Sequence, residues 1–302
     1  WGTAFDDWGQ NFFTETSDPN LRWMLPGSVR VRYGEFAPNP PNLVEEKHRV
    51  RPTAGLEFVS SRHFPDDVQG DMLLHNTIGF LGTKQHTLED DGTGYRSRHR
   101  HDLLFSSDPN FRPVDMEFAP DGSFYLLDWH NVLIGHMQHN MRDPNRDHSH
   151  GRIYRVTYPS RPLVKPAKID GASIAELLEN LKLPEYRSRY RTRRELRSRN
   201  PNEVVQATQA WVKDLPKDAD ERLKLEALWV SWGANRIDLK LMEQLLKSKD
   251  HRIRSGAARV LRFNLRNTPK RRALLLAAAN DPHGRVRLEA IAAASYMGKR
   301  VG

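Results

Sequence analysis

The sequence predicts a two-part β + α fold, in which short strands are followed by an array of paired helices. Alternating β-rich runs separated by tight turns fill residues 1–158, and helical segments recur at regular spacing after them. The charge changes at the same place: residues 159–302 carry 31 Lys and Arg against 16 Asp and Glu, whereas residues 1–158 carry 16 against 22. We therefore expect two domains, residues 1–162 and 163–302.

The strand pattern is clearest in residues 108–158. Two β-rich runs, residues 111–119 and 123–129, flank a Pro-Asp-Gly turn, in which Pro presets φ, Asp bonds its own backbone and Gly tolerates positive φ. A polar loop then leads to a third run, residues 151–158. This is the outline of a β-propeller blade with an elaborated loop.

Two further units precede this segment. Residues 2–16 repeat its outline around a turn at Asp7 to Gln10, and four strands are expected between Ala54 and Ser106. Units of roughly 40 to 50 residues are typical of propeller blades. The Pro-rich residues 34–52 are expected to form a connection. The first domain is therefore predicted to be the C-terminal part of a β-propeller.

The second domain is predicted to be a solenoid of HEAT-like helical repeats. Ser173 followed by Glu176 has the capping-box spacing and marks the first helix. Four similar segments then begin at Arg191, Arg222, Arg252 and Arg285. Spacings of 31, 30 and 33 residues suit stacked helix pairs, and the recurring alanines allow close packing. These alanines are Ala227, Ala257 and Ala290.

Composition excludes several classes of site within this chain. Without cysteine it has no disulfide, zinc-thiolate site or CxxCH haem attachment. Neither a signal stretch nor an apolar run of about 18 residues is present, so no transmembrane span is predicted. Because the chain opens at Trp1, we expect it to be a piece of a longer protein.

The loop of residues 135–150 is the first candidate site. Its side chains combine a general base, an anion clamp and metal ligands, since His titrates near neutrality and Arg binds carboxylates bidentately. They are His136, His139, His148, His150, Arg142, Arg146, Asp143 and Asp147. The alternative is a surface loop held together by its own hydrogen bonds. No zinc-binding spacing is present, so no metal site is predicted here.

Propellers bind ligands where their innermost strands begin, which makes Arg112 and Asp115 the leading pair. His75 closes a run in the preceding blade and is expected near the same axis. Asp128 and Trp129 end the next strand, where turn capping and filling the space between blades are the structural alternatives.

Two more groups of charged residues have a ligand-binding and a structural interpretation. Asp6, Asp7, Asp90 and Asp91 are candidate calcium ligands, but turn formation is the simpler explanation because no DxDxDG spacing is present. Seven arginines with two tyrosines in residues 186–199 suit nucleic-acid binding. The repeat alignment instead places that segment in a helix, with arginines facing solvent or paired to acids. Nucleic-acid binding is therefore not expected.

Three motifs, RPVDMEFAPDG, DWHN and RDPNRDHSHGRIYR, together with the helical array, resemble one family. It comprises the membrane-bound dehydrogenase-like proteins of planctomycetes and verrucomicrobia, whose propeller is similar to that of quinoprotein glucose/sorbosone dehydrogenases. The resemblance implies a six-bladed propeller, HEAT-like repeats and a C-terminal haem domain in the cell envelope or periplasm. This chain lacks the first blades and the haem motif, so we expect it to be inactive alone.

The resemblance implies oxidation of a sugar or alcohol by pyrroloquinoline quinone, and calcium is a further candidate cofactor. Electrons would pass to a cytochrome c-type haem domain or another acceptor in the parent protein. Asp115 and His75 are the candidate catalytic residues, and Arg112, Arg142 and His150 the candidate cofactor-binding residues. The alternative is a non-catalytic scaffold that binds glycans, or a protein partner through its helical repeats.

Overall fold

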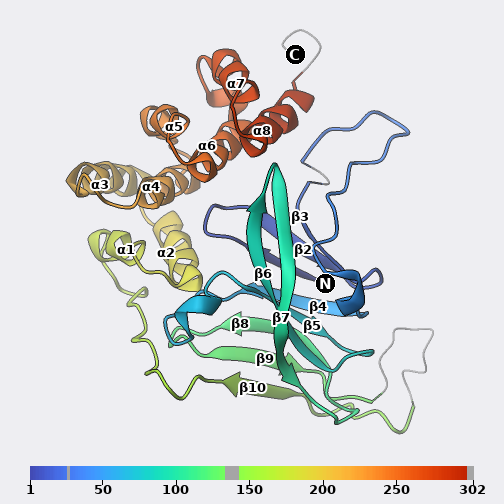
Figure 1. Ribbon diagram of the computed structural model, residues 1–302. Helices are drawn as coiled ribbons and strands as arrows, with labels where there is room; N and C mark the ends of the chain where they lie inside the picture. Colours follow the sequence, from blue (N-terminus) through green and yellow to red (C-terminus); the bar gives the residue numbers. More distant parts are fainter. Residues whose placement is uncertain (26–27, 133–142, 298–302) are drawn as a thin grey trace.

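The computed structural model describes residues 1–25, 28–132 and 143–297. In these ranges it contains three antiparallel sheets and eight α-helices, with the strands before the helices along the chain (Figure 1). The prediction of a mixed β + α chain is therefore confirmed.

The first sheet is a meander of three short strands, β1 (Gly2–Phe5), β2 (Asn11–Glu15) and β3 (Asn20–Trp23). The predicted turn connects β1 and β2, and in it the Asp6 carboxylate accepts the backbone N–H groups of Trp8 and Gln10. The sequence did not predict β3, because four residues are too few to show alternation.

The second sheet contains four strands in sequence order. They are β4 (Thr53–Phe58), β5 (Met72–Asn76), β6 (Gly82–Asp91) and β7 (Gly94–Phe105). The four expected strands are thus confirmed, but the last turn lies at Gly92, where φ is +55°, and not after Tyr95. Tyr95 consequently lies within β7 and is buried.

The third sheet contains β8 (Pro113–Phe118), β9 (Phe124–Asp128) and β10 (Arg152–Val156). Its Pro-Asp-Gly turn forms as predicted. Gly122 has a φ of +79°, and the Asp121 carboxylate accepts the backbone N–H and hydroxyl of Ser123.

The three sheets stack with their first strands side by side, because β4 contacts both β1 and β8. One apolar core, including Phe12, Leu21 and Met72, lies between the first and second sheets. A second core, including Leu73, Met116 and Phe124, lies between the second and third sheets. The strand domain is thus built from layers that pack through alternate residues of each strand.

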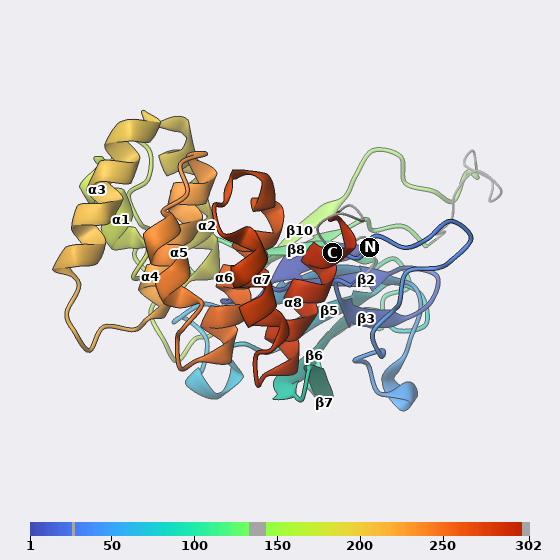
Figure 2. The same ribbon diagram turned by 90° about the horizontal axis from the view of Figure 1, so that it is seen from above.

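The helical array forms two rows. The helices are α1 (Ile174–Asn180), α2 (Tyr186–Ser198), α3 (Pro201–Asp214), α4 (Arg222–Gly233), α5 (Leu239–Leu245), α6 (His251–Phe263), α7 (Arg271–Ala279) and α8 (Gly284–Ser295). Helices α2, α4, α6 and α8 contact one another in turn and form the row nearer the sheets (Figures 1 and 2). The four similar sequence segments all lie in this inner row. Ser173 and Glu176 form the predicted capping box of α1. No helix in the described part of the chain is long and apolar enough to span a membrane.

Residues 157–173, between β10 and α1, are fixed to the strand domain by His63. The backbone N–H of Tyr158 donates to its Nε2 at 2.8 Å, so Nδ1 carries the proton and donates to the carbonyl of Pro162 at 2.9 Å. His63 is 2 % exposed. The array therefore meets the sheets through a connection held at a buried point.

Candidate functional site

Arg112 is buried and bound to backbone. Its side-chain N–H groups donate to the carbonyls of Asn131, Thr77 and Val132 at 3.1, 2.8 and 3.0 Å. The residue as a whole is 8 % exposed. Burial lowers the pKa of Arg112 from its ordinary value. These contacts join the ends of two sheets, so they give Arg112 a structural function, and quinone binding by it stays a prediction.

His75 and Asp115 lie close together but face different surroundings. His75 is fully buried, and burial lowers its pKa to about 3, which keeps the ring neutral. Its Nε2 donates to the backbone carbonyl of Asp115, and its Nδ1 accepts from the hydroxyl of Thr83. The Asp115 residue is exposed, and its carboxylate accepts the backbone N–H of Met116. Both ring nitrogens of His75 are occupied, and catalysis by either residue stays a prediction.

The His-rich loop lies beside the third sheet, and part of it is not described. Arg142, His136 and His139 fall outside the described residues. His150 is exposed and pairs with Asp147, with 3.0 Å between its Nδ1 and a carboxylate oxygen.

Trp129 and this loop line a hollow of about 450 Å³. Trp129 is 41 % exposed, so it does not fill a space between sheets of this chain. Asp128 accepts the backbone N–H of His130, as its structural interpretation predicted. Cofactor binding by His150 stays a prediction.

The junction between the sheets and the helices contains the most buried charges. Glu226 is fully buried and accepts from Arg189 at 2.9 Å and from Arg193 at 2.6 Å. Arg189 also reaches Asp7 in the first sheet's turn. Arg187 donates to Glu57 on β4 at 2.7 Å, and the desolvation of Glu57 raises its carboxyl pKa. These arginines therefore connect α2 to the first and second sheets.

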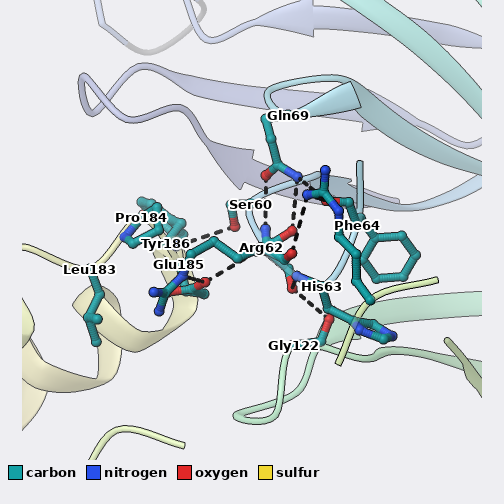
Figure 3. A network of polar contacts seen from close by, with 12 residues as sticks. Ser60, Arg62, His63, Phe64, Gln69, Gly122, Leu183, Pro184, Glu185 and Tyr186 are labelled. Atoms are coloured by element: carbon teal, nitrogen blue, oxygen red, sulfur yellow. Dashed lines mark hydrogen bonds and ion pairs between the residues drawn. The ribbon is translucent and has the colours of Figure 1, made fainter. Parts of the chain in front are cut away.

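A second set of contacts fixes the start of α2 (Figure 3). The Nε of Arg62 donates to Glu185 at 2.7 Å, and its Nη2 donates at 3.0 Å in a bidentate arrangement. The hydroxyl of Ser60 accepts the backbone N–H of Tyr186. The side-chain amide of Gln69 donates to three backbone carbonyls in the loop between β4 and β5. The loop between β4 and β5 thus fixes the position of the start of α2.

A cleft of about 540 Å³ lies at this junction. The polar residues in its lining include Asp6, Asp90, Gln69, Ser60 and Arg252, beside apolar residues. The apolar side chains include Phe58, Val59 and Leu88. Its volume is that of sites which take small ligands. The sequence had marked Asp6 and Asp90 only as turn residues or calcium ligands.

Asp6 has the most informative electrostatics in this cleft. Burial raises the pKa of its carboxyl to about 6, against the opposing effect of the Gln10 N–H and the charge of Arg259. The hydroxyl of Tyr95 lies 3.5 Å from its second oxygen. A carboxyl that titrates near neutrality in a cleft is typical of functional sites.

The far side of the cleft is joined to α8. Arg285 lies 4.0 Å from the centre of the Tyr95 ring and donates to the Gly94 carbonyl at 2.7 Å. It also pairs with Asp90 at 3.0 Å. Burial raises the pKa of the Tyr95 hydroxyl well above its ordinary value, so this hydroxyl remains protonated. Hydrogen bonding, and not phenolate chemistry, is what Tyr95 offers.

Comparison with known proteins identifies the first half of the chain. Residues 1–160 match the model of DUF7133, described as a domain of unknown function. The chain belongs to the DUF7133 family. No curated protein and no solved structure matches it. In this DUF7133 chain, the matched region contains all three sheets and every strand residue of the cleft. Among the described residues, no group of three or more His, Asp or Glu is arranged to hold a metal ion.

Proposed function

We propose that this chain is a carbohydrate-binding scaffold whose sugar site is the cleft between the sheets and the inner row of helices. The observation that supports this most is the composition of the cleft. Residues with carboxylate, amide, hydroxyl and guanidinium side chains line one hollow beside apolar residues. Sugar hydroxyls both donate and accept hydrogen bonds, so they match a lining that holds both kinds of group.

The rigidity of the cleft also supports binding. Its walls come from two sheets and from α2 and α6, and the ion pairs of Arg187 with Glu57 and of Arg189 with Asp7 connect α2 to both sheets. Side chains that are fixed before the ligand arrives lose little conformational entropy when it binds, which raises affinity. The same arrangement favours a binding function over a mechanism that needs domain closure.

We further propose that the sheets are propeller blades and the helices HEAT-like repeats. In each sheet the strands follow sequence order, and the three first strands lie side by side, as innermost strands of adjacent blades do. The four helix pairs stack with one helix of each pair in a shared row. A solved structure of a longer parent protein tests this directly, because it predicts further blades around the same axis.

Asp6→Asn is the most direct test of the sugar site. The asparagine carbonyl still accepts the N–H groups of Trp8 and Gln10, so the fold is preserved while the charge is lost. We expect wild-type protein to bind members of a glycan array and the variant to bind at least about tenfold more weakly, since a bond to a charged group contributes about 1.5–3 kcal/mol. Asp91→Asn, on the exposed hairpin tip, is the matched control and is expected to bind normally.

The binding should also depend on pH. Because the pKa of Asp6 is about 6, its carboxylate is charged at pH 7 and protonated at pH 5. Affinity is therefore expected to fall between pH 7 and pH 5 in wild type and to stay constant in Asp6→Asn. Absence of glycan binding, or equal binding by both proteins, would remove the sugar site from this cleft.

The oxidoreductase interpretation rests on the family resemblance. Most side-chain nitrogens of Arg112 and His75 already form hydrogen bonds within the protein, and His75 is fully buried. These contacts leave Arg112 and His75 few polar atoms for the carboxylates of a quinone, and cofactor binding stays a prediction from the resemblance. Dye reduction with aldoses, measured on the full-length parent with added quinone and calcium, tests this interpretation. Activity that is lost in Arg112→Ala and Asp115→Ala would support it.

A further inference from the structure

A second hollow, which we call the basic groove, lies on the inner row of helices. It encloses about 500 Å³ between α2, α4, α6 and the β1–β2 turn. Its aromatic residues are Phe5, Tyr186, Tyr190, Trp229, Trp232 and Phe263, and its cations are Arg193, Arg194, Arg197 and Arg259. No Asp or Glu lines it. The groove is therefore apolar in its walls and purely cationic in its charge.

The arginines of the groove fall into two classes. Arg193 pairs with Glu226, and Arg259 pairs with Glu289 at 2.6 Å, so both charges are neutralised within the protein. Arg194 and Arg197 are exposed, and neither forms an ion pair among the described residues. They are three residues apart on α2 and so share one side of the helix. The rim of the groove thus carries two uncompensated positive charges.

The groove continues into a neighbouring hollow of about 620 Å³ through their shared residue Phe263. That hollow is lined by Arg266 and Arg271, which are exposed and, in the described ranges, have no acidic partner. No Asp or Glu lines it either. Two adjoining hollows with the same charge form an elongated surface, which suits an extended chain better than a compact small molecule.

The lining specifies the chemistry of the ligand. Guanidinium groups offer only donors, so the polar atoms of the ligand must be acceptors, and carboxylates match guanidinium forks best. Phe263 is 61 % exposed and Tyr190 is 38 % exposed, which leaves apolar surface for a large side chain. A neutral sugar, which must also donate, matches this groove less well than the cleft.

The rings of the groove favour a peptide over a single-stranded nucleic acid. Arg193 lies over Trp229, Arg194 lies over Tyr190, and Trp232 stacks on Phe263 at 5.6 Å between ring centres. Arg193 also lies over Tyr186, so five of the six rings already have a partner, whereas base recognition requires ring faces on which successive bases stack.

We propose that the basic groove binds an acidic peptide segment that carries one large apolar side chain. The apolar side chain enters beside Phe263 and Tyr190, and carboxylates on either side of it pair with the unpaired arginines of the rim. This site adjoins the sugar cleft, because Phe5 and Tyr186 line both hollows, but Arg194 and Arg197 line only the groove, so its test does not depend on glycan binding.

The test is fluorescence anisotropy of the full chain with a labelled peptide of Glu and Asp residues around one central Trp. Arg194→Glu with Arg197→Glu is expected to weaken binding at least about tenfold, because charge reversal replaces attraction by repulsion. Lys213→Glu with Lys240→Glu changes the net charge equally on the exposed outer helices, and is expected to change affinity less than about twofold. Replacing the Trp of the peptide by Gly is expected to weaken binding as well.

Circular dichroism checks that both double variants fold, which is expected because all four side chains are exposed. The proposal is overturned if the peptide does not bind, if both double variants weaken binding equally, or if the Gly peptide binds as well as the Trp peptide. It is also overturned if oligo(dT) binds more tightly and displaces the peptide, which would assign the groove to nucleic acid.

Discussion

The two ends of the strand domain use charged residues in opposite ways. At the junction with the helices, Arg189 is almost fully buried and pairs both with the buried Glu226 of α4 and with Asp7 of the strand domain. At the loop beside the third sheet, His150 and Asp147 are exposed and pair with a near neighbour in sequence. Both regions are dense in charge, but only the junction joins distant segments around a cleft.

This difference shows that the density of His, Arg and Asp in a sequence does not by itself locate a site. Local pairs such as Asp147 with His150 form a turn and need no ligand. Buried pairs across domains hold two surfaces in fixed positions, and a cleft between such surfaces is preorganised. The following predictions test this contrast, beginning with the largest effect.

Glu226→Gln is expected to destabilise the protein most. It leaves Arg189 and Arg193 without their buried carboxylate, and breaking such pairs costs about 3–5 kcal/mol. Urea unfolding followed by circular dichroism measures the loss. Asp147→Asn, at the loop, is the matched control and is expected to unfold at the wild-type urea concentration. Equal midpoints for the two variants would contradict the contrast.

Arg112→Ala is expected to cost about 3 kcal/mol, because three carbonyls at the end of the sheets lose their buried donors. The same unfolding measurement checks this value. His150→Ala, which removes the other described candidate for cofactor binding, should leave the midpoint unchanged. If Arg112→Ala were as stable as wild type, the structural function of Arg112 would be disproved, and an anion-binding function would be favoured instead.

The strand domain also contains a pH-sensitive position at His86, which is buried with no hydrogen-bond partner for either nitrogen among the described residues. Burial, together with the positive charges of His99, His48 and Lys84, lowers its pKa to about 3, and Glu45 opposes this shift. The unfolded chain takes up this proton below about pH 6.5, whereas the folded chain does so only near pH 3. Above pH 6.5, His86 therefore does not lower the free energy of unfolding. As the pH falls from 6.5 toward 3, the free energy of unfolding decreases.

His86→Phe removes this loss. At pH 5 the variant is expected to be about 2 kcal/mol more stable than wild type, with a much smaller difference at pH 7. Thermal unfolding at the two pH values gives the result. A difference that is the same at both pH values would show that packing, and not protonation, separates the two proteins.

Glu185→Gln should have the smallest effect, about 1 kcal/mol, because its partner Arg62 is 56 % exposed in its side chain and is solvated when the pair is lost. The expected order of unfolding midpoints is therefore Glu226→Gln below Arg112→Ala, and Arg112→Ala below Glu185→Gln. A cost for Glu185→Gln that equals the cost for Glu226→Gln would mean that burial does not set the strength of the junction.

Most of the fold follows from short-range patterns in the sequence. The Pro-Asp-Gly turn, the four strands of the second sheet and the capping box at Ser173 depend on residues close in sequence, and all three were predicted. Strand β3 was missed because it is short, and its pairing with β2 gives no sequence period.

The cleft was not predictable in the same way. It forms where Asp6, Asp90 and Arg252 meet, and these residues are distant in sequence and individually ordinary. The arginines of α2 were expected to pair with acids or to face solvent, and the structure contains both classes. What the sequence lacked was the identity of their partners, since Glu57 and Asp7 lie in a different domain.

Hydrogen–deuterium exchange with a glycan selected on the array tests the central claim most directly. If the cleft is the sugar site, the bound glycan will slow exchange in residues 5–10, 57–61 and 88–95 and leave residues 143–153 unchanged. Protection of residues 143–153 without protection at the cleft would contradict this account and return the site to the His-rich loop.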